Sequence, residues 1–247
     1  SDQDGSGFGF DVAGAGDING DGYADVIVGA HQYNAANLFR AGRVFLFLGS
    51  ADGVSAEAAW SFSGGAANDN LGTALDGVGD INGDGFDDIV IGAPRFRGDE
   101  RSEGRVYGFL GAGQGLSAEP DWTWEGGARN AYAGSAIAAA GDVNSDGFAD
   151  FIVGVPGHSD GQASEGRAVV FYGGQAGFPA APGWGILGAP AASNAGRGRC
   201  VTRAVNTRRV ARAHARTHAS THTHTHTHTQ VKLTLIRVRK GDNATVA

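Results

Sequence analysis

The fold of this 247-residue chain is decided by one stretch, Gly16-Asp17-Ile18-Asn19-Gly20-Asp21-Gly22-Tyr23-Ala24-Asp25-Val26-Ile27-Val28-Gly29-Ala30. The same pattern starts again at Gly79 and at Gly141, after intervals of 63 and 62 residues. A Gly-Arg pair at Gly42 and a tryptophan at Trp60 recur with nearly the same spacing. A fixed interval of this size indicates a repeat architecture. The sequence therefore predicts three full units, whose blades start near residues 7, 70 and 132. It also predicts the opening of a fourth unit within residues 184–196, whose blade starts near residue 194.

Each unit contains four short apolar runs separated by turn residues, which indicates four β-strands. In the second unit these runs are 71–78, 88–93, 104–110 and 120–125, and the run 88–93 is continuously apolar after its acid, as expected of a strand buried on both faces. Four strands in about sixty residues match one blade of a β-propeller. The chain has 43 glycines and 6 prolines without a Gly-X-Y period, which favours a turn-rich fold over a helical bundle or collagen. We predict an all-β fold, a β-propeller of four-stranded blades.

The loop between the first and second runs of each unit carries oxygen-bearing side chains at alternate positions. Positions 1, 3, 5 and 9 are Asp, Asn, Asp and Asp, and position 6 is glycine. Such a loop suits Ca²⁺, which takes 6–8 oxygen ligands, and the carbonyl of the aromatic residue at position 7 adds one more. We predict about three Ca²⁺ sites. Their candidate ligands are Asp17, Asn19, Asp21, Tyr23 and Asp25 in the first loop, Asp80, Asn82, Asp84, Phe86 and Asp88 in the second, and Asp142, Asn144, Asp146, Phe148 and Asp150 in the third.

Other interpretations of these loops fit less well. An EF-hand requires Glu at position 12, where this chain has Val28, Ile91 and Val153. Mg²⁺ demands a compact octahedral shell, and metal-free Asx-turns do not require all four ligand types to recur three times. No cysteine precedes Cys200, so metal would be the main cross-link of residues 1–196. We also expect the aromatic ring at position 7 to pack into its own blade.

The landmarks on either side of each loop resemble those of the FG-GAP repeats in the β-propeller of integrin α-subunits. The first landmark is Phe8-Gly9 in the first unit, and the second is Gly29-Ala30, with counterparts in the other two units. The resemblance covers nearly all of residues 1–196 and implies calcium loops, a protein partner bound by loops on one face, and an extracellular or cell-surface location. Integrin-type propellers have seven blades, so about three and a half blades need further sequence or a second copy to complete a ring.

We expect a binding or adhesion module and no enzyme, because residues 1–196 contain only His31 and His158 and no convergent acid–base set. The run 157–161 has the G-x-S-x-G spacing of a nucleophile elbow, but the helix that this motif requires is not expected after it. Two alternatives stay open. One is an accessory propeller of a larger secreted enzyme, as in the phospholipase D that cleaves glycolipid anchors. The other is a carbohydrate-binding propeller, for which the tryptophans would have to face solvent rather than pack between blades.

Charge divides the chain, since residues 1–196 carry a formal charge of −17 and residues 197–247 carry +10. The second segment runs into alternating His and Thr at 222–229, which a CA-dinucleotide repeat encodes. We interpret 197–247 as an unfolded low-complexity tail or the product of a frameshift or retained intron. It contains no aromatic residue to stack on bases, so we expect no specific nucleic-acid partner. The sequence also contains no membrane span or signal segment, and its opening within a repeat suggests a piece of a longer protein.

Overall fold

The computed structural model describes residues 3–160 and 164–188. The chain divides into two units, Ser1–Val205 and Asn206–Ala247, and the second lies outside the described residues. The tail expected from residue 197, and residues 189–196 of the expected fourth repeat, also lie outside them. All regular elements of the described residues are β-strands, and this part of the chain contains no helix able to cross a membrane.

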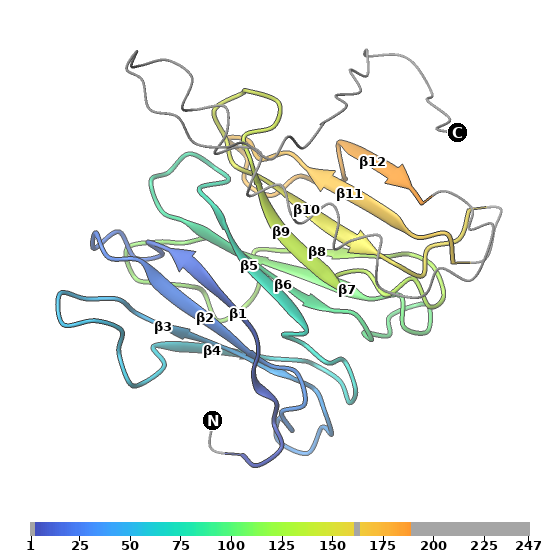
Figure 1. The fold of residues 1–247 in the computed structure, drawn as a ribbon, viewed down its shortest axis with the longest axis horizontal. Helices are drawn as coiled ribbons and strands as arrows, with labels where there is room; N and C mark the ends of the chain where they lie inside the picture. Colours follow the sequence, from blue (N-terminus) through green and yellow to red (C-terminus); the bar gives the residue numbers. More distant parts are fainter. Residues whose placement is uncertain (1–2, 161–163, 189–247) are drawn as a thin grey trace, which may run out of the picture. The chain divides into compact units, whose positions relative to one another are not determined.

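The described strands form three antiparallel sheets of four strands each (Figure 1). Blade 1 contains β1 (Phe8–Gly16), β2 (Asp25–Ala30), β3 (Arg43–Phe47) and β4 (Trp60–Ser63). Blade 2 contains β5 (Ala74–Gly79), β6 (Asp88–Ala93), β7 (Arg105–Phe109) and β8 (Trp122–Glu125). Blade 3 contains β9 (Ala136–Gly141), β10 (Asp150–Val155), β11 (Arg167–Phe171) and β12 (Trp184–Leu187). Within each sheet the strand order follows the chain, so each repeat is one blade and the predicted all-β propeller architecture is confirmed.

The predicted strands agree with the observed ones, with one change of assignment. All six residues of β6 are buried, as its continuous apolar run predicts for a strand covered on both faces. Trp184, which we expected in the opening of a fourth unit, lies instead in β12 and pairs with Val170 of β11. It therefore completes blade 3, in the same way as Trp60 and Trp122 begin the fourth strands of blades 1 and 2.

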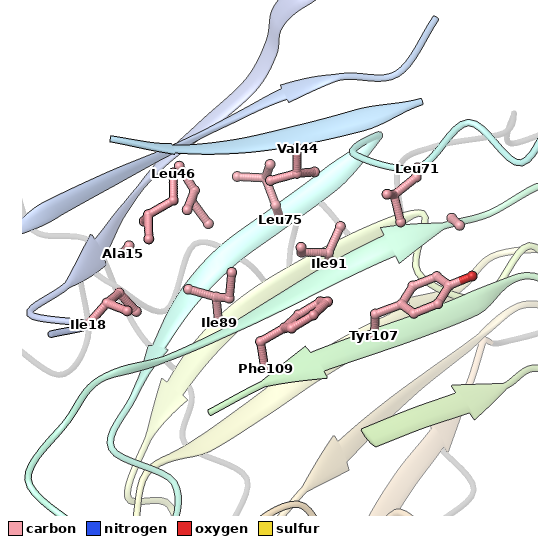
Figure 2. Packing of buried hydrophobic residues seen from close by; sticks show 12 residues of the cluster. Ala15, Ile18, Val44, Leu46, Leu71, Leu75, Ile89, Ile91, Tyr107 and Phe109 are labelled. Carbon is pink, nitrogen blue, oxygen red and sulfur yellow. The ribbon is translucent and has the colours of Figure 1, made fainter. Parts of the chain in front are cut away.

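Neighbouring blades pack face to face through their apolar side chains. In the seam between blades 1 and 2, Val44 and Leu46 of β3 lie in the same cluster as Leu75, Ile89 and Ile91 of blade 2 (Figure 2). A second cluster joins the other face of blade 2 to blade 3. Burial of each such side chain contributes roughly 1.5–3 kcal/mol, so the seams carry much of the stability of the described unit.

The tryptophans that begin β4 and β8 fasten each blade to the next. Trp60 Nε1 donates a hydrogen bond to the carbonyl of Ser117 (2.8 Å), and Trp122 Nε1 donates to that of Pro179 (2.9 Å). The Trp60 ring also meets Phe109 edge to face, with ring centroids 5.0 Å apart. These contacts support the predicted blade-to-blade role for Trp60 and Trp122.

The two outermost faces of the described blades are open. Val12 of β1 is 58% exposed, whereas its counterpart in blade 2, Leu75, is 3% exposed. At the other end Trp184 is 46% exposed, because no described residues stand where a further blade would cover it. The ring is therefore not closed by the described residues.

The strand ends separate two kinds of loop. The acidic end carries the β1–β2, β5–β6 and β9–β10 loops, which are residues 17–24, 80–87 and 142–149. The opposite end carries the β2–β3, β6–β7 and β10–β11 loops and the links between blades. All eight arginines of residues 1–196 lie at this second end, which we call the arginine end: Arg40, Arg43, Arg95, Arg97, Arg101, Arg105, Arg129 and Arg167.

Candidate metal centre

The predicted calcium ligands occupy equivalent places in all three blades. Positions 1 to 7 lie in the loop at the acidic end, and position 9 is the first residue of the strand after it. Glycine at position 6 has a positive φ in every copy, 89° at Gly22 and 94° at both Gly85 and Gly147. A residue with a Cβ is strained in that region, which explains the glycine.

The aspartate at position 1 organises the loop by accepting backbone hydrogen bonds. In the second loop Asp80 Oδ1 accepts from the amides of Gly83 (2.6 Å) and Asp84 (3.1 Å), and Asp80 Oδ2 accepts from Gly85 (2.8 Å). Asp17 and Asp142 accept from the amides at positions 5 and 6 in the same way. The carboxylate is therefore held at the centre of the turn rather than extended into solvent.

The side chains at positions 3 and 5 converge on each other. Asn82 Nδ2 donates to Asp84 Oδ2 at 2.8 Å, and the corresponding distances in the first and third loops are 2.9 and 2.7 Å. Asp84 Oδ1 meanwhile accepts from the amide of Phe86 (3.0 Å). Each loop thus presents two carboxylates and one amide in a small, exposed turn.

The aspartate at position 9 is buried and joins the loop to the rest of its blade. Asp88 Oδ2 accepts from the amide of Ile81 (2.7 Å), and Asp88 Oδ1 accepts from Gly111 (2.8 Å), which lies just after β7. Burial raises the pKa of Asp88 to about 7, with the two hydrogen bonds opposing the rise and the negative charges of Asp84 and Asp80 adding to it. The pKa values of Asp25 and Asp150 are raised for the same reasons.

The chemistry of these loops fits a hard divalent cation. Every donor is an oxygen, and the buried position-9 carboxylate lies close enough to its two acidic neighbours for their charges to raise its pKa. Within the described residues, however, no three or more His, Cys, Asp or Glu side chains are grouped as a metal cage. The loop carboxylates accept hydrogen bonds from their own backbone instead. The fifteen predicted ligands are therefore brought together loop by loop, and their role as ligands stays a prediction.

The aromatic ring at position 7 does not pack only into its own blade, as we expected, but lies over the loop of the preceding one. A Cβ added to Gly20 of the first loop would come within 2.6 Å of Phe86, and one added to Gly83 would come within 2.9 Å of Phe148. Tyr23, which has no preceding described blade, is 43% exposed. The ring crosses the seam because position 4 is a glycine in the first two loops and leaves room for it.

Sequence reasoning missed Asp87, which stands at position 8 of the second loop. Its Oδ2 accepts a hydrogen bond from the amide of Asp17 (2.8 Å) across the seam. The third loop has Ala149 at this position, although the adjoining backbone bond from the position-8 amide to the position-1 carbonyl is present in both seams, at 3.1 Å. A comparison of position 8 among the three repeats, which is aspartate only in the second, could have identified Asp87 from the sequence.

The nucleophile-elbow spacing at 157–161 finds no support in the described part of that loop. Gly161 lies outside the described residues. Ser159 Oγ accepts from the amide of Ser164 (2.8 Å), and His158 donates its amide to Val155 in a turn. The expected absence of catalysis stays a prediction.

Comparison with known proteins identifies the repeat that builds these blades. The FG-GAP repeat model matches residues 8–47, 71–109 and 133–171. These ranges run from the start of the first strand, or just before it, to the end of the third strand of blades 1, 2 and 3. The described part of the chain therefore contains three FG-GAP repeats, one in each blade.

Individual relatives fall into two groups. Integrin alpha-6 of Gallus gallus is 34% identical over 153 residues, 60% of this chain and 13% of the relative. Integrin alpha-IIb of Homo sapiens is 35% identical over 157 residues, 61% of this chain and 15% of the relative. Phosphatidylinositol-glycan-specific phospholipase D of Bos taurus is 33% identical over 167 residues, 64% of this chain and 20% of the relative. The matched region thus spans a fifth or less of the length of these relatives.

Proposed function

We propose that residues 1–196 form a calcium-stabilised segment of an extracellular β-propeller that binds a protein partner, as in cell adhesion. The observation that carries the proposal is the threefold recurrence of one loop with the same hydrogen bonds and the same buried aspartate. The similarity to integrin alpha subunits supports the adhesion role and a cell-surface location. In this proposal residues 197–247 are a separate tail, and missing blades or a second copy complete the ring.

The stabilising role arises from the charges in each loop. Asp80, Asp84 and Asp88 repel one another, and burial of Asp88 adds to the cost of its ionisation. Bound calcium would supply the positive charge that neutralises this repulsion. Asp88 would then hold the loop to the amide of Gly111 in its ionised form, and Asp80 would keep the turn closed through its three backbone amides. Millimolar extracellular calcium suits sites of this kind.

The calcium assignment is tested by titration calorimetry and thermal unfolding of the full chain. We expect about three Ca²⁺ per chain and a higher melting temperature in calcium, because a ligand that binds only the folded state stabilises it. Asp84→Ala should remove one site and loosen blade 2. The matched control is Asp52→Ala, an exposed acid at the same end in the β3–β4 turn, which should keep all sites. No binding heat together with no rise in melting temperature would contradict the proposal.

The phospholipase D relatives favour a second candidate, in which the same blades are an accessory module of a larger secreted enzyme. In that case the chain itself carries no catalysis, and its arginine end would contact other parts of the enzyme or its substrate. Sequencing the transcript from the codons for Gly196 to Cys200 onward separates the candidates by the domains that it encodes downstream. Further FG-GAP loops would support a complete propeller, and a hydrolase domain in the same transcript would support the accessory role.

A further inference from the structure

A cleft of about 280 Å³ opens at the arginine end, where blade 1 meets blade 2. Its walls come from β1, from the β2–β3 loop, from the link between β4 and β5, and from the start of the β6–β7 loop. The polar part of this wall is made by His31, Gln32, Arg40, Asn70, Thr73 and Arg95. A space of this size accepts one or two residues of an extended chain, and it is too small for a folded element.

Two arginines give the cleft a positive charge, and neither of them forms an ion pair within the described residues. No carboxylate among residues 3–160 and 164–188 comes within salt-bridge distance of Arg40 or Arg95, and the single ion pair found there joins Arg105 to Glu125. The charges of Arg40 and Arg95, after burial, hold the pKa of His31 below its usual range. Both guanidinium groups therefore act on the same part of the cleft, which favours an anionic ligand.

The cleft also contains an acceptor that lacks a donor. Asn70 is 8% exposed, and its Nδ2 donates to the carbonyl of His31 (3.2 Å), which fixes the orientation of the amide. Asn70 Oδ1 is buried and has no hydrogen-bond partner. An unpaired buried acceptor costs roughly 1–3 kcal/mol, and a ligand that carries an N–H group would recover this.

The seam between blades 2 and 3 provides a natural comparison, because its backbone is the same and its side chains differ. Tyr132 replaces Asn70 with nearly the same φ, 55° against 54°. The amide of Asn70 donates to the carbonyl of Arg40 (3.2 Å), and the amide of Tyr132 donates to that of Ser102 (3.1 Å). Gly157 stands in the place of Arg95. The shared backbone therefore does not require Arg40, Asn70 or Arg95, and these three side chains do not recur at the matching positions of the second seam, Ser102, Tyr132 and Gly157.

We propose that this cleft binds an acidic side chain of a peptide segment, with Arg40 and Arg95 pairing with its carboxylate and Asn70 Oδ1 accepting a backbone N–H. A peptide is favoured over an inorganic or sulfated anion because it supplies the carboxylate and the N–H donor together. Phe10, whose ring centroid lies 3.8 Å from that of His31, gives the cleft an apolar wall against which the peptide chain can lie. The assignment deepens the proposed function, since it rests on a protein partner and states the chemistry of that partner.

In the test, a blocked peptide, N-acetyl-Gly-Asp-Gly amide, is titrated into the full chain in excess calcium. Binding is measured by NMR or by calorimetry. We expect the Asp peptide to bind at least about tenfold more tightly than its Asn counterpart, because the carboxylate meets two guanidinium groups. The double variant R40Q/R95Q should lose most of this preference. The matched control is Arg97→Gln, an exposed arginine of the same end that does not line the cleft, and it should stay within about twofold of the unmodified chain.

Three results would overturn the assignment: equal binding of the Asp and Asn peptides, an R40Q/R95Q variant that binds as the unmodified chain does, or inorganic phosphate that binds as tightly as the peptide. Both arginines are exposed, so the double variant should fold, and its melting temperature checks this. The same samples report on the proposed function separately. A calcium-dependent melting temperature without peptide binding counts against the cleft alone, whereas a missing calcium response counts against the calcium-stabilised module.

Discussion

The acidic end and the arginine end of the blades share one repeated backbone, but they differ in which side chains recur from blade to blade. At the acidic end, Asp17, Asp80 and Asp142 make the same hydrogen bonds in three successive loops. At the arginine end the link between blades has the same φ values at Asn70 and Tyr132, yet the side chains are unrelated. Side chains that recur in every unit are those that each blade needs in order to fold. Arg40, Asn70 and Arg95, which the second seam lacks, are the side chains that we propose to bind a ligand.

The largest expected effect separates the two ends by stability. Asp88→Ala would leave the buried amides of Ile81 and Gly111 without an acceptor, which we expect to cost about 3 kcal/mol in calcium. Arg95→Ala at the opposite end should change the free energy of unfolding by less than about 0.5 kcal/mol. Denaturant unfolding of both variants measures the difference. Equal losses would remove the distinction between a structural end and a binding end.

The next prediction concerns pH and rests on the raised pKa of Asp88. The ordinary pKa of this aspartate is 3.8, and in the folded chain it is about 7. Between these two pH values Asp88 holds a proton in the folded chain that it has released in the unfolded chain. Without calcium the stability should therefore fall as pH rises through this window. Calcium favours the ionised carboxylates, so it should raise the melting temperature by several degrees more at about pH 7.5 than at about pH 5.

Thermal scans with calcium and with a chelator at both pH values check this prediction. Arg97→Gln, at the arginine end, serves as the control, because Arg97 is exposed, lies outside the acidic loops and does not line the cleft that contains His31, so it should leave the pH dependence unchanged. A calcium effect of the same size at both pH values would show that Asp88 does not control it.

A smaller effect should come from the ring that crosses the first seam. Gly20 and Gly22 both have positive φ, 73° and 89°, so alanine is strained at either position. Only at Gly20 would the added Cβ collide with Phe86, since nothing lies within 4 Å of one at Gly22. We expect Gly20→Ala to cost about 1 kcal/mol more than Gly22→Ala in chelator, measured by denaturant unfolding. Identical costs would mean that the ring moves aside freely.

The smallest expected effect distinguishes the two seams at the acidic end itself. Asp87→Ala removes the hydrogen bond to the amide of Asp17 and gives the first seam the alanine that the second seam has at Ala149. We expect a loss of about 1 kcal/mol, together with weaker calcium binding at the first loop only. Calorimetry that finds all three sites weakened alike would instead indicate a general effect on the fold.

Much of the fold could be predicted because the sequence repeats the pattern of one blade three times. The order of the strands, the fully buried β6 and the seam position of Trp60 and Trp122 are all consequences of the period and of apolar patterning. The loop residues were also recognisable, since their spacing alone brings them into one turn. These are local properties, and a local pattern is enough to fix them.

Contacts between blades could not be predicted in this way. The reach of Phe86 over Gly20 depends on how closely two sheets pack, and no spacing in the sequence indicates this. The cleft was missed because Arg40, Asn70 and Arg95 come from three separate segments that meet only when the blades are stacked. A comparison of Asn70 with Tyr132 and of Arg95 with Gly157 would have marked these positions as different, although not as neighbours.

The aromatic side chain at position 7, which lies over the loop of the preceding blade, makes the two sides of the row of blades unequal in how they open. Phe86 covers the first acidic loop at Gly20, and Phe148 covers the second at Gly83, so each of these two loops is covered by the next blade along the chain. In a stack whose units touch only their neighbours, opening starts at an end and spreads inward. Detachment of blade 3 would therefore remove Phe148 from the second loop and expose it. Detachment of blade 1 would leave the coverage of the second and third loops unchanged. Among these three blades, loss of blade 3 should therefore speed hydrogen exchange in the second loop, whereas loss of blade 1 should not.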